Sequence, residues 1–97
     1  MYVVRDIFNC KPGKAKELVK KFKAAIPLMP GIAGKNSRVM TDLVAPYWTV
    51  VIETEMDDLA DYLKNARSAT GSPELGEIMK GYMDLVDGGH REIFMVE

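Results

Sequence analysis

The stretch that decides the fold is YWTVVIETE at residues 47–55, the strongest β-strand signal in the chain. Strands favour aromatic and β-branched residues of this kind. Because successive strand residues point to opposite faces, its side chains form two sets: Trp48, Val50 and Ile52 on one face, and Tyr47, Thr49, Val51 and Glu53 on the other. Both sets are largely apolar, whereas a strand with one face in water alternates between apolar and polar residues. The stretch therefore predicts a sheet that is covered on both faces.

Other parts of the chain supply the partners of this strand. Residues 2–9, 38–44 and 90–97 have the same β-branched and aromatic character. Pro- and Gly-rich residues over 27–37 predict a loop before the second of these strands. The chain is therefore expected to contain four strands.

Three helical segments separate the strands. From Ala15 onward, apolar residues recur at the i, i+3, i+4, i+7 spacing of an amphipathic helix. Asp57 is a suitable capping residue for a second helix. Ser72 and Pro73 begin a third, whose apolar stripe over 75–86 is closed by Gly88-Gly89.

Six lysines lie between Lys11 and Lys23, mostly off the apolar stripe of the first helix. A nucleic-acid-binding domain usually has a surplus of positive charge, but this chain has a net charge of −1 and a pI of about 5.8. Residues 1–50 have nine basic and three acidic side chains (+6), and residues 51–97 have four basic and eleven acidic ones (−7). We therefore interpret the lysines as the solvent side of a helix, and no nucleic-acid partner is expected.

The order β-α-β-β-α-α-β over residues 1–97 predicts a single α+β domain of the ferredoxin-like type. Its helices should cover one face of a four-stranded antiparallel sheet. The other face would leave roughly several hundred Å² of apolar surface in water, more than monomers usually expose. We therefore predict a homodimer whose sheets pack face to face. The predicted interface residues are Arg5, Trp48, Val50 and Ile52, with Arg5 paired to a carboxylate across the dimer. The alternatives are that Arg5 binds an anion and that Trp48 stacks on an aromatic ligand.

The layout resembles the dimeric α/β-barrel proteins, and within them the NIPSNAP and antibiotic-biosynthesis-monooxygenase-like groups. The features that carry the resemblance are the KPGKAKELVKKF opening of the first helix, the helix after ETEMDD, the short extra helix and the chain length. The resemblance implies a homodimeric barrel with a small pocket in each subunit, between helices and sheet. Such proteins include cofactor-free oxygenases of aromatic polyketides or quinols, haem-degrading enzymes and isomerases.

Overlaying the haem-degrading members places Asp6 where they have an asparagine and Glu53 where they have a tryptophan. No histidine lies in the predicted helices to ligate a haem iron. The resemblance therefore implies a pocket without haem, and no cofactor is predicted.

Asp6, Glu53 and His90 are the candidate catalytic residues. If the first and third strands are neighbours, the two carboxylates could lie together, raise one pKa and provide a general base. The alternatives are that Asp6 pairs with Arg5, a lysine or Arg91, that Glu53 lies in water, and that His90 is exposed near a turn. The spacing of these residues matches no metal site, so no metal is predicted.

Phe8, Tyr47, Tyr62 and Tyr82 are the candidate ligand-binding residues, with packing as the alternative for the tyrosines. The predicted ligand is a hydrophobic or aromatic small molecule, and the predicted activity is cofactor-independent monooxygenation. The alternative is a non-catalytic ligand-binding or assembly module. One cysteine, no signal peptide and no apolar run of membrane-spanning length favour a cytoplasmic protein without a membrane partner.

Overall fold

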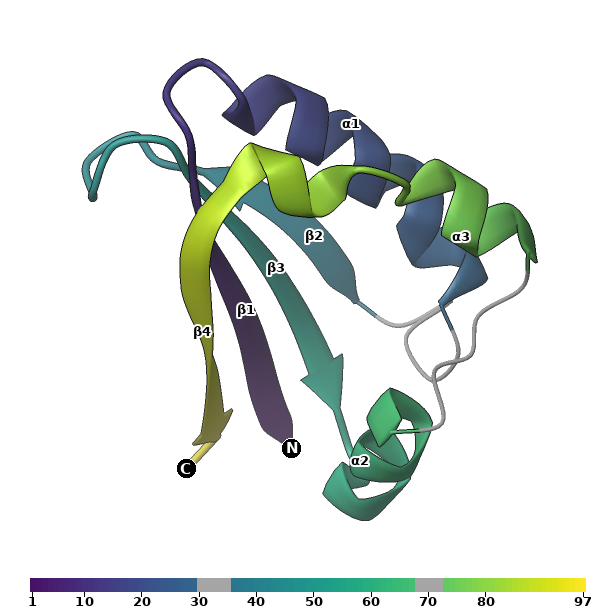
Figure 1. The fold of residues 1–97 in the computed structure, drawn as a ribbon. Helices are drawn as coiled ribbons and strands as arrows, with labels where there is room; N and C mark the ends of the chain where they lie inside the picture. Colours follow the sequence, from purple (N-terminus) through teal and green to yellow (C-terminus); the bar gives the residue numbers. More distant parts are fainter. Residues whose placement is uncertain (30–35, 68–72) are drawn as a thin grey trace.

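The computed structural model describes residues 1–29, 36–67 and 73–97. A sheet forms one layer, and the helices lie against one of its faces (Figure 1). The elements in chain order are β1 (Tyr2–Cys10), α1 (Ala15–Ala25), the 3₁₀ helix η1 (Ile26–Leu28), β2 (Ser37–Thr41), β3 (Thr49–Met56), α2 (Leu59–Arg67), α3 (Pro73–Ile78), the 3₁₀ helix η2 (Tyr82–Leu85) and β4 (Val86–Met95). The predicted α+β, ferredoxin-like arrangement with one antiparallel sheet is confirmed.

The strands pair in the order β2-β3-β1-β4, all antiparallel. In the centre of the sheet, Asp6 of β1 lies between Ile52 of β3 and Arg91 of β4. Its neighbour Arg5 lies between Glu53 and Glu92. Since side chains alternate along a strand, these two rows lie on opposite faces of the sheet.

The helix-side face carries the hydrophobic core. Leu18 and Phe22 of α1 are buried against Val50 and Ile52 of β3, as the apolar stripe of α1 predicts. A second cluster joins Tyr62 of α2 to both central strands through Val4 and Met56. The prediction that Val50 and Ile52 form a dimer interface is therefore wrong, because the helices of the same chain already cover them.

The opposite face, which we call the open face, has a charged centre. The Glu53 side chain is only 8% exposed, and it accepts a hydrogen bond from Arg5 Nε at 2.7 Å and others from Arg38. The Arg5 guanidinium also lies 5.5 Å from the centre of the Phe94 ring. Arg5 thus finds its carboxylate within its own chain, and the predicted need for a partner across a dimer is wrong.

Half-buried apolar side chains surround this charged centre. Val3 and Ile7 of β1, Met40 of β2 and Val51 of β3 share the open face with Arg5. Phe94 of β4 adds a half-exposed ring. The open face is therefore mixed, with an ion cluster inside an apolar rim.

The third helix differs most from its prediction. α3 ends at Ile78, η2 follows, and β4 already begins at Val86. Gly81 has a φ of 79°, a left-handed conformation that suits glycine and ends the helical path. Lys21 of α1 donates hydrogen bonds from Nζ to the carbonyl oxygens of Ile78 and Lys80, so one lysine of the basic segment caps another helix. Ser72, the predicted capping residue, lies outside the described residues.

The glycine pair expected to end that helix lies inside β4 instead. A Cβ atom on Gly89 would lie 2.2 Å from the carbonyl oxygen of Ile7 in β1, closer than atoms can approach. A Cβ on Gly88 would meet nothing within 4 Å. Gly89 therefore permits the close approach of β4 to β1 beside the register shift at Asn9/Cys10.

We expect Gly89→Ala to lower the free energy of unfolding by about 1–3 kcal/mol, because the added methyl group must push β4 away from β1. Gly88→Ala is the matched control, and it should stay within about 0.5 kcal/mol of the wild type. Urea unfolding followed by circular dichroism measures both variants. Equal stability of the two would contradict the close approach.

We expect Glu53→Gln to lower the free energy of unfolding by about 1–2 kcal/mol at pH 7, a modest loss because both arginines are partly exposed. Hydrogen bonding to Arg5, together with Arg38, holds the pKa of Glu53 below its ordinary value although burial opposes this. The carboxylate therefore stabilises the fold above its unfolded pKa of about 4.3, and this is lost as the pH falls through the folded pKa.

The test is urea unfolding of both proteins at pH 7, 5 and 3. The difference in the free energy of unfolding between the wild type and Glu53→Gln should be largest at neutral pH and shrink below about pH 4. Glu55→Gln, on the same strand and face, is the control and should change stability by less than about 0.5 kcal/mol. A wild-type advantage that persists unchanged in acid would contradict this role of the Glu53 charge.

Candidate functional site

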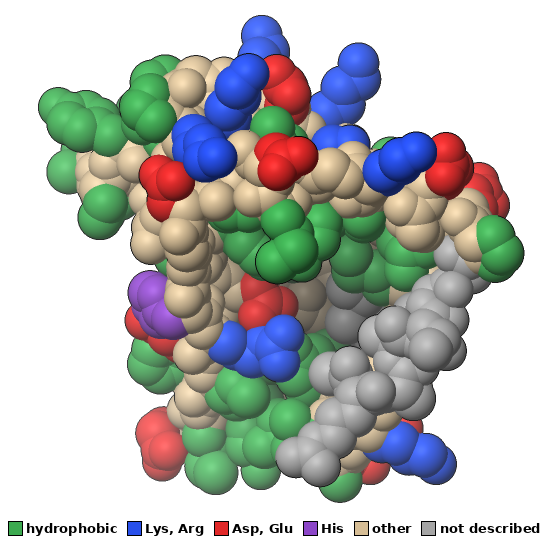
Figure 2. Space-filling view, in the orientation of Figure 1, with side chains coloured by type: hydrophobic (Ala, Val, Ile, Leu, Met, Phe, Trp, Pro, Cys, Tyr) green, Lys and Arg blue, Asp and Glu red, His purple; other side chains and the backbone are tan. Residues whose placement is uncertain are grey.

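A pocket of about 410 Å³ lies on the helix-side face, where β4 and β1 meet η2. We call it the β4 pocket. Figure 2 shows a hollow below the upper helices, in which acidic and basic side chains meet among hydrophobic ones. The residues that shape it come from three elements: Asp6 and Phe8 of β1, Tyr82 and Met83 of η2, and Gly89 and Arg91 of β4.

An ion pair forms the polar part of this pocket. Arg91 donates a hydrogen bond from Nε to Oδ1 of Asp6 at 2.5 Å, and the Asp6 side chain is 25% exposed. This is one of the alternatives that the sequence left open for Asp6. The hydrogen bond to Asp6 raises the pKa of Arg91, although burial opposes the charge. Arg91 therefore remains a cation, and the pair offers a fixed cationic donor beside a fixed acceptor.

Tyr62 lies beside this pair but belongs to the neighbouring core. Its ring centre is 5.7 Å from the Arg91 guanidinium, and its side chain packs with Val4 and Met56. Burial raises the pKa of Tyr62, the Asp6 charge raises it further and Arg91 opposes both. Tyr62 is therefore a neutral residue beside Arg91, and it does not line the β4 pocket.

Asp6 and Glu53 do not come together. Asp6 faces the helices, whereas Glu53 faces the open side between Arg5 and Arg38. The predicted carboxylate pair is therefore wrong, because residues 6 and 53 lie one position out of register and so on opposite faces. The alternative that Glu53 lies in water is also wrong, because its side chain is only 8% exposed.

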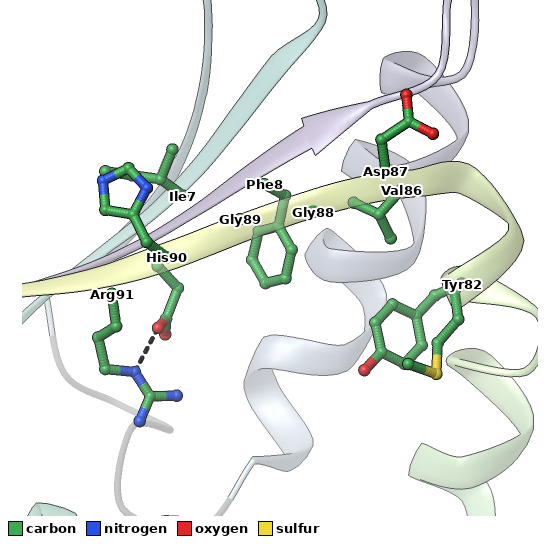
Figure 3. Close-up of a pocket in the computed structure, with 11 residues that line it drawn as sticks. Ile7, Phe8, Tyr82, Val86, Asp87, Gly88, Gly89, His90 and Arg91 are labelled. Atoms are coloured by element: carbon green, nitrogen blue, oxygen red, sulfur yellow. Dashed lines mark hydrogen bonds and ion pairs between the residues drawn. The ribbon is translucent and has the colours of Figure 1, made fainter.

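His90 lies in the middle of β4 rather than at the start of the last strand. Figure 3 shows its ring on the side of β4 away from Phe8, Tyr82 and Arg91. Its Nε2 atom lies 3.1 Å from Oε2 of Glu92. The ring is thus directed to the open face, and only the backbone at this position adjoins the β4 pocket.

The predicted ligand-binding aromatic residues separate into groups. Phe8 and Tyr82 line the β4 pocket, and the Phe8 ring also lies 4.9 Å from that of Phe22 in the core. Tyr47 lies in the β2–β3 connection and is 86% exposed. It does not line the β4 pocket but borders a second pocket beside α1. Their role in ligand binding stays a prediction.

Arg91 is a site residue that the sequence suggested only as an alternative partner of Asp6. The alternation of HREIF could have indicated it, since Arg91 and Ile93 share a face. Alternation does not say which set of side chains turns toward the helices, so this signal alone does not place Arg91 in a pocket. Met83 was missed because the sequence predicts helix over 75–86, where the structure has η2.

Two further findings concern the described parts of the chain. No group of three or more histidine, cysteine, aspartate or glutamate side chains there has the arrangement of a metal site. No helix within these parts has the length and apolar character needed to cross a membrane.

Cys10 is buried beside Leu18 in the core. Burial, together with the charges of Asp42 and Asp87, raises the pKa of its thiol. Cys10 therefore has the surroundings of a packing residue.

Comparison with known proteins identifies solved structures of the same fold, but no match at the level of the sequence. No protein-family model and no curated protein matches the sequence. An uncharacterized NIPSNAP domain protein from Burkholderia xenovorans superposes with a TM-score of 0.80 at 13% identity, covering 100% of this chain and 95% of that one. A NIPSNAP family protein from Agrobacterium tumefaciens gives 0.82 at 15% identity, covering 99% and 92%.

An antibiotic biosynthesis monooxygenase-like protein from Chloroflexus aurantiacus gives a TM-score of 0.70 at 14% identity, covering 99% of this chain and 92% of that one. At such identities the similarity concerns the course of the chain and not the reaction. The protein therefore has the ferredoxin-like fold of the NIPSNAP and antibiotic biosynthesis monooxygenase-like structures, as the sequence resemblance implied.

Proposed function

We propose that this protein is a homodimer whose β4 pockets each bind an aromatic or otherwise hydrophobic small molecule with one polar group. The observation that carries the proposal is the Asp6–Arg91 pair inside a pocket whose other walls include Phe8 and Tyr82. Ligand sites typically combine apolar walls with a few fixed polar groups. A pocket of about 410 Å³ has room for a molecule of one or two rings.

The polar group of the ligand is expected to face the ion pair. Arg91 uses Nε for Asp6, and its side chain is 48% exposed, so its other N–H groups are available to an oxyanion of the ligand. Asp6 Oδ2 can accept a hydrogen bond from a hydroxyl group. A phenol or quinol fits both requirements, because its hydroxyl group can donate to Asp6 and its oxygen can accept from Arg91.

The catalytic form of this proposal is cofactor-independent monooxygenation, with Asp6 as the acceptor of a hydroxyl proton and Arg91 beside the resulting oxyanion. It draws on the fold shared with antibiotic biosynthesis monooxygenase-like proteins. The second candidate is a non-catalytic binding module. It is favoured because, among the described residues, neither His90 nor Glu53 faces the pocket to relay a proton from Asp6.

A reduced naphthoquinol is the probe that tests the site. We expect the wild type to bind it, measured by calorimetry without oxygen, and we expect Arg91→Gln and Asp6→Asn each to weaken binding about tenfold or more, since each removes a charged hydrogen-bonding group. Arg38→Gln and Glu55→Gln are matched controls on the open face. Binding that is absent, or equal in all five proteins, would overturn the site.

Oxygen uptake with the same probe separates the two candidates. The monooxygenase requires uptake that the protein accelerates and that Asp6→Asn abolishes. Binding without accelerated uptake supports the non-catalytic module. Turnover that Asp6→Asn leaves unchanged would remove Asp6 from the mechanism.

The homodimer in this proposal rests on the open face. Its apolar rim, with Val3, Ile7, Met40 and Val51 half-buried and Phe94 half-exposed, would be covered by a second sheet. Glu53 already has two arginine partners within the chain, so covering it leaves no unpaired carboxylate. Apolar burial then favours association at about 25 cal/mol per Å² before the costs of association.

We expect Val51→Lys to abolish this contact, because it would bury an unpaired charge between two sheets. Sedimentation equilibrium at micromolar concentration measures the mass against that of the 10.8 kDa chain. Lys20→Glu, on the exposed side of α1, is the control and should leave the mass unchanged. A wild type that stays a single chain would contradict the dimer.

A further inference from the structure

The β2–β3 connection, residues 42–48, ends in a projecting apolar tip. Leu43 and Val44 are each 96% exposed, and Tyr47 is 86% exposed. Figure 1 shows this connection reaching beyond the sheet, and Figure 2 shows hydrophobic side chains gathered there. We call Leu43, Val44 and Tyr47 the apolar tip. Single exposed apolar residues are common, but a cluster on one projection indicates a contact surface.

The base of the tip is tied down. Asp42 Oδ1 accepts a hydrogen bond from Thr49 N at 2.9 Å, and Thr49 Oγ1 donates one to the carbonyl oxygen of Pro46 at 2.7 Å. Cys10 N donates to the carbonyl oxygen of Trp48 at 2.8 Å. Trp48 has a φ of 62°, a left-handed conformation that a non-glycine residue adopts only where its surroundings impose it. The tip is thus presented in one shape before it meets a partner.

A second pocket of about 410 Å³ lies directly beside the tip, which we call the α1 pocket. Its walls come from Ala15, Lys16 and Val19 of α1 and from Asp42 and Trp48 of the connection, together with the flank of Tyr47. Its walls are mainly apolar. Because α1 covers the helix-side face, this pocket lies apart from the open face.

Two opposite charges, Lys16 and Asp42, line this pocket. Within the described parts of the chain, Lys16 forms no ion pair, and only Oδ1 of the Asp42 carboxylate accepts a hydrogen bond, from Thr49 N. The two residues line one pocket without bonding to each other. A partner that brings an acid to Lys16 and a base to Asp42 would complement both.

We propose that a second copy of this chain occupies the α1 pocket, each copy inserting its apolar tip into the pocket of the other. A projection beside a hollow is self-complementary under a twofold axis, since each copy then supplies both at once. The same axis places Lys16 of each copy near Asp42 of the other. This contact lies beyond the proposed open-face dimer and does not depend on it, so a chain that makes both contacts assembles from dimers into a larger oligomer, which is a closed tetramer when the two twofold axes cross at right angles.

Sedimentation equilibrium over a concentration series from micromolar upward tests the contact. We expect the double variant Leu43→Ser with Val44→Ser to weaken this association step about tenfold or more, since both side chains lie at the centre of the contact. Both residues are exposed, so the fold should survive; unfolding by urea checks this. Leu63→Ser, also an exposed leucine but on α2, is the matched control and should change nothing.

The open-face variant keeps this test separate from the proposed function. With Val51→Lys alone, association through the tip should remain and give a dimer; with Val51→Lys and the tip variant together, a single chain is expected. If the open-face dimer does not form, the wild type should still be a dimer, held together by the apolar tips alone. If tip variants never change the mass, the proposal is overturned, whether or not the tip then binds vesicles or another protein.

A charge variant gives an independent check. Lys16→Glu places like charges across the twofold axis and should weaken association several-fold, and adding Asp42→Asn should restore part of it by removing the repulsion. The amide oxygen that Asp42→Asn introduces can still accept the hydrogen bond from Thr49 N, so the base of the tip is kept. Weakening by Lys16→Glu that Asp42→Asn does not relieve would contradict this pairing.

Discussion

Strand β1 places two neighbouring charged residues on opposite faces of the sheet, and the rest of the structure depends on how each is neutralised. Arg5 meets Glu53 of β3 on the open face, and Asp6 meets Arg91 of β4 on the helix side. Partly buried charges are costly unless paired. The two pairs therefore tie β1 to both of its neighbours and favour this register of the sheet, since a shift of β1 by one residue would move Arg5 and Asp6 to the opposite faces and separate both pairs.

The two pairs lie in different surroundings. Around Asp6 and Arg91, the helices leave a pocket with aromatic walls, so the pair remains partly accessible to a small molecule. Around Glu53, two arginines neutralise one carboxylate on a face rimmed with apolar side chains. One face thus has an ion pair beside a pocket, and the other has an ion cluster inside an apolar rim.

Sequence patterns predicted the elements whose apolar periodicity was complete. The stripe of α1 and the β-branched stretch of β3 each appear where expected, within a few residues at their ends. The region from Leu75 to Gly89 was harder, because its helical stripe continued past the point where Gly81 turns the chain. The error moved the start of β4, and with it the placement of His90 within the strand.

The sequence by itself determined the order of the elements, the α+β class and the presence of apolar residues on both faces of the sheet, because these follow from local periodicity. Only the tertiary structure decided which face meets the helices, since alternation assigns residues to two sets without saying which set lies inward. For that reason the sequence indicated Asp6 and Glu53 as candidate catalytic residues, but their partners, Arg91 for one and Arg5 with Arg38 for the other, emerged only from strand pairing across long separations in the chain.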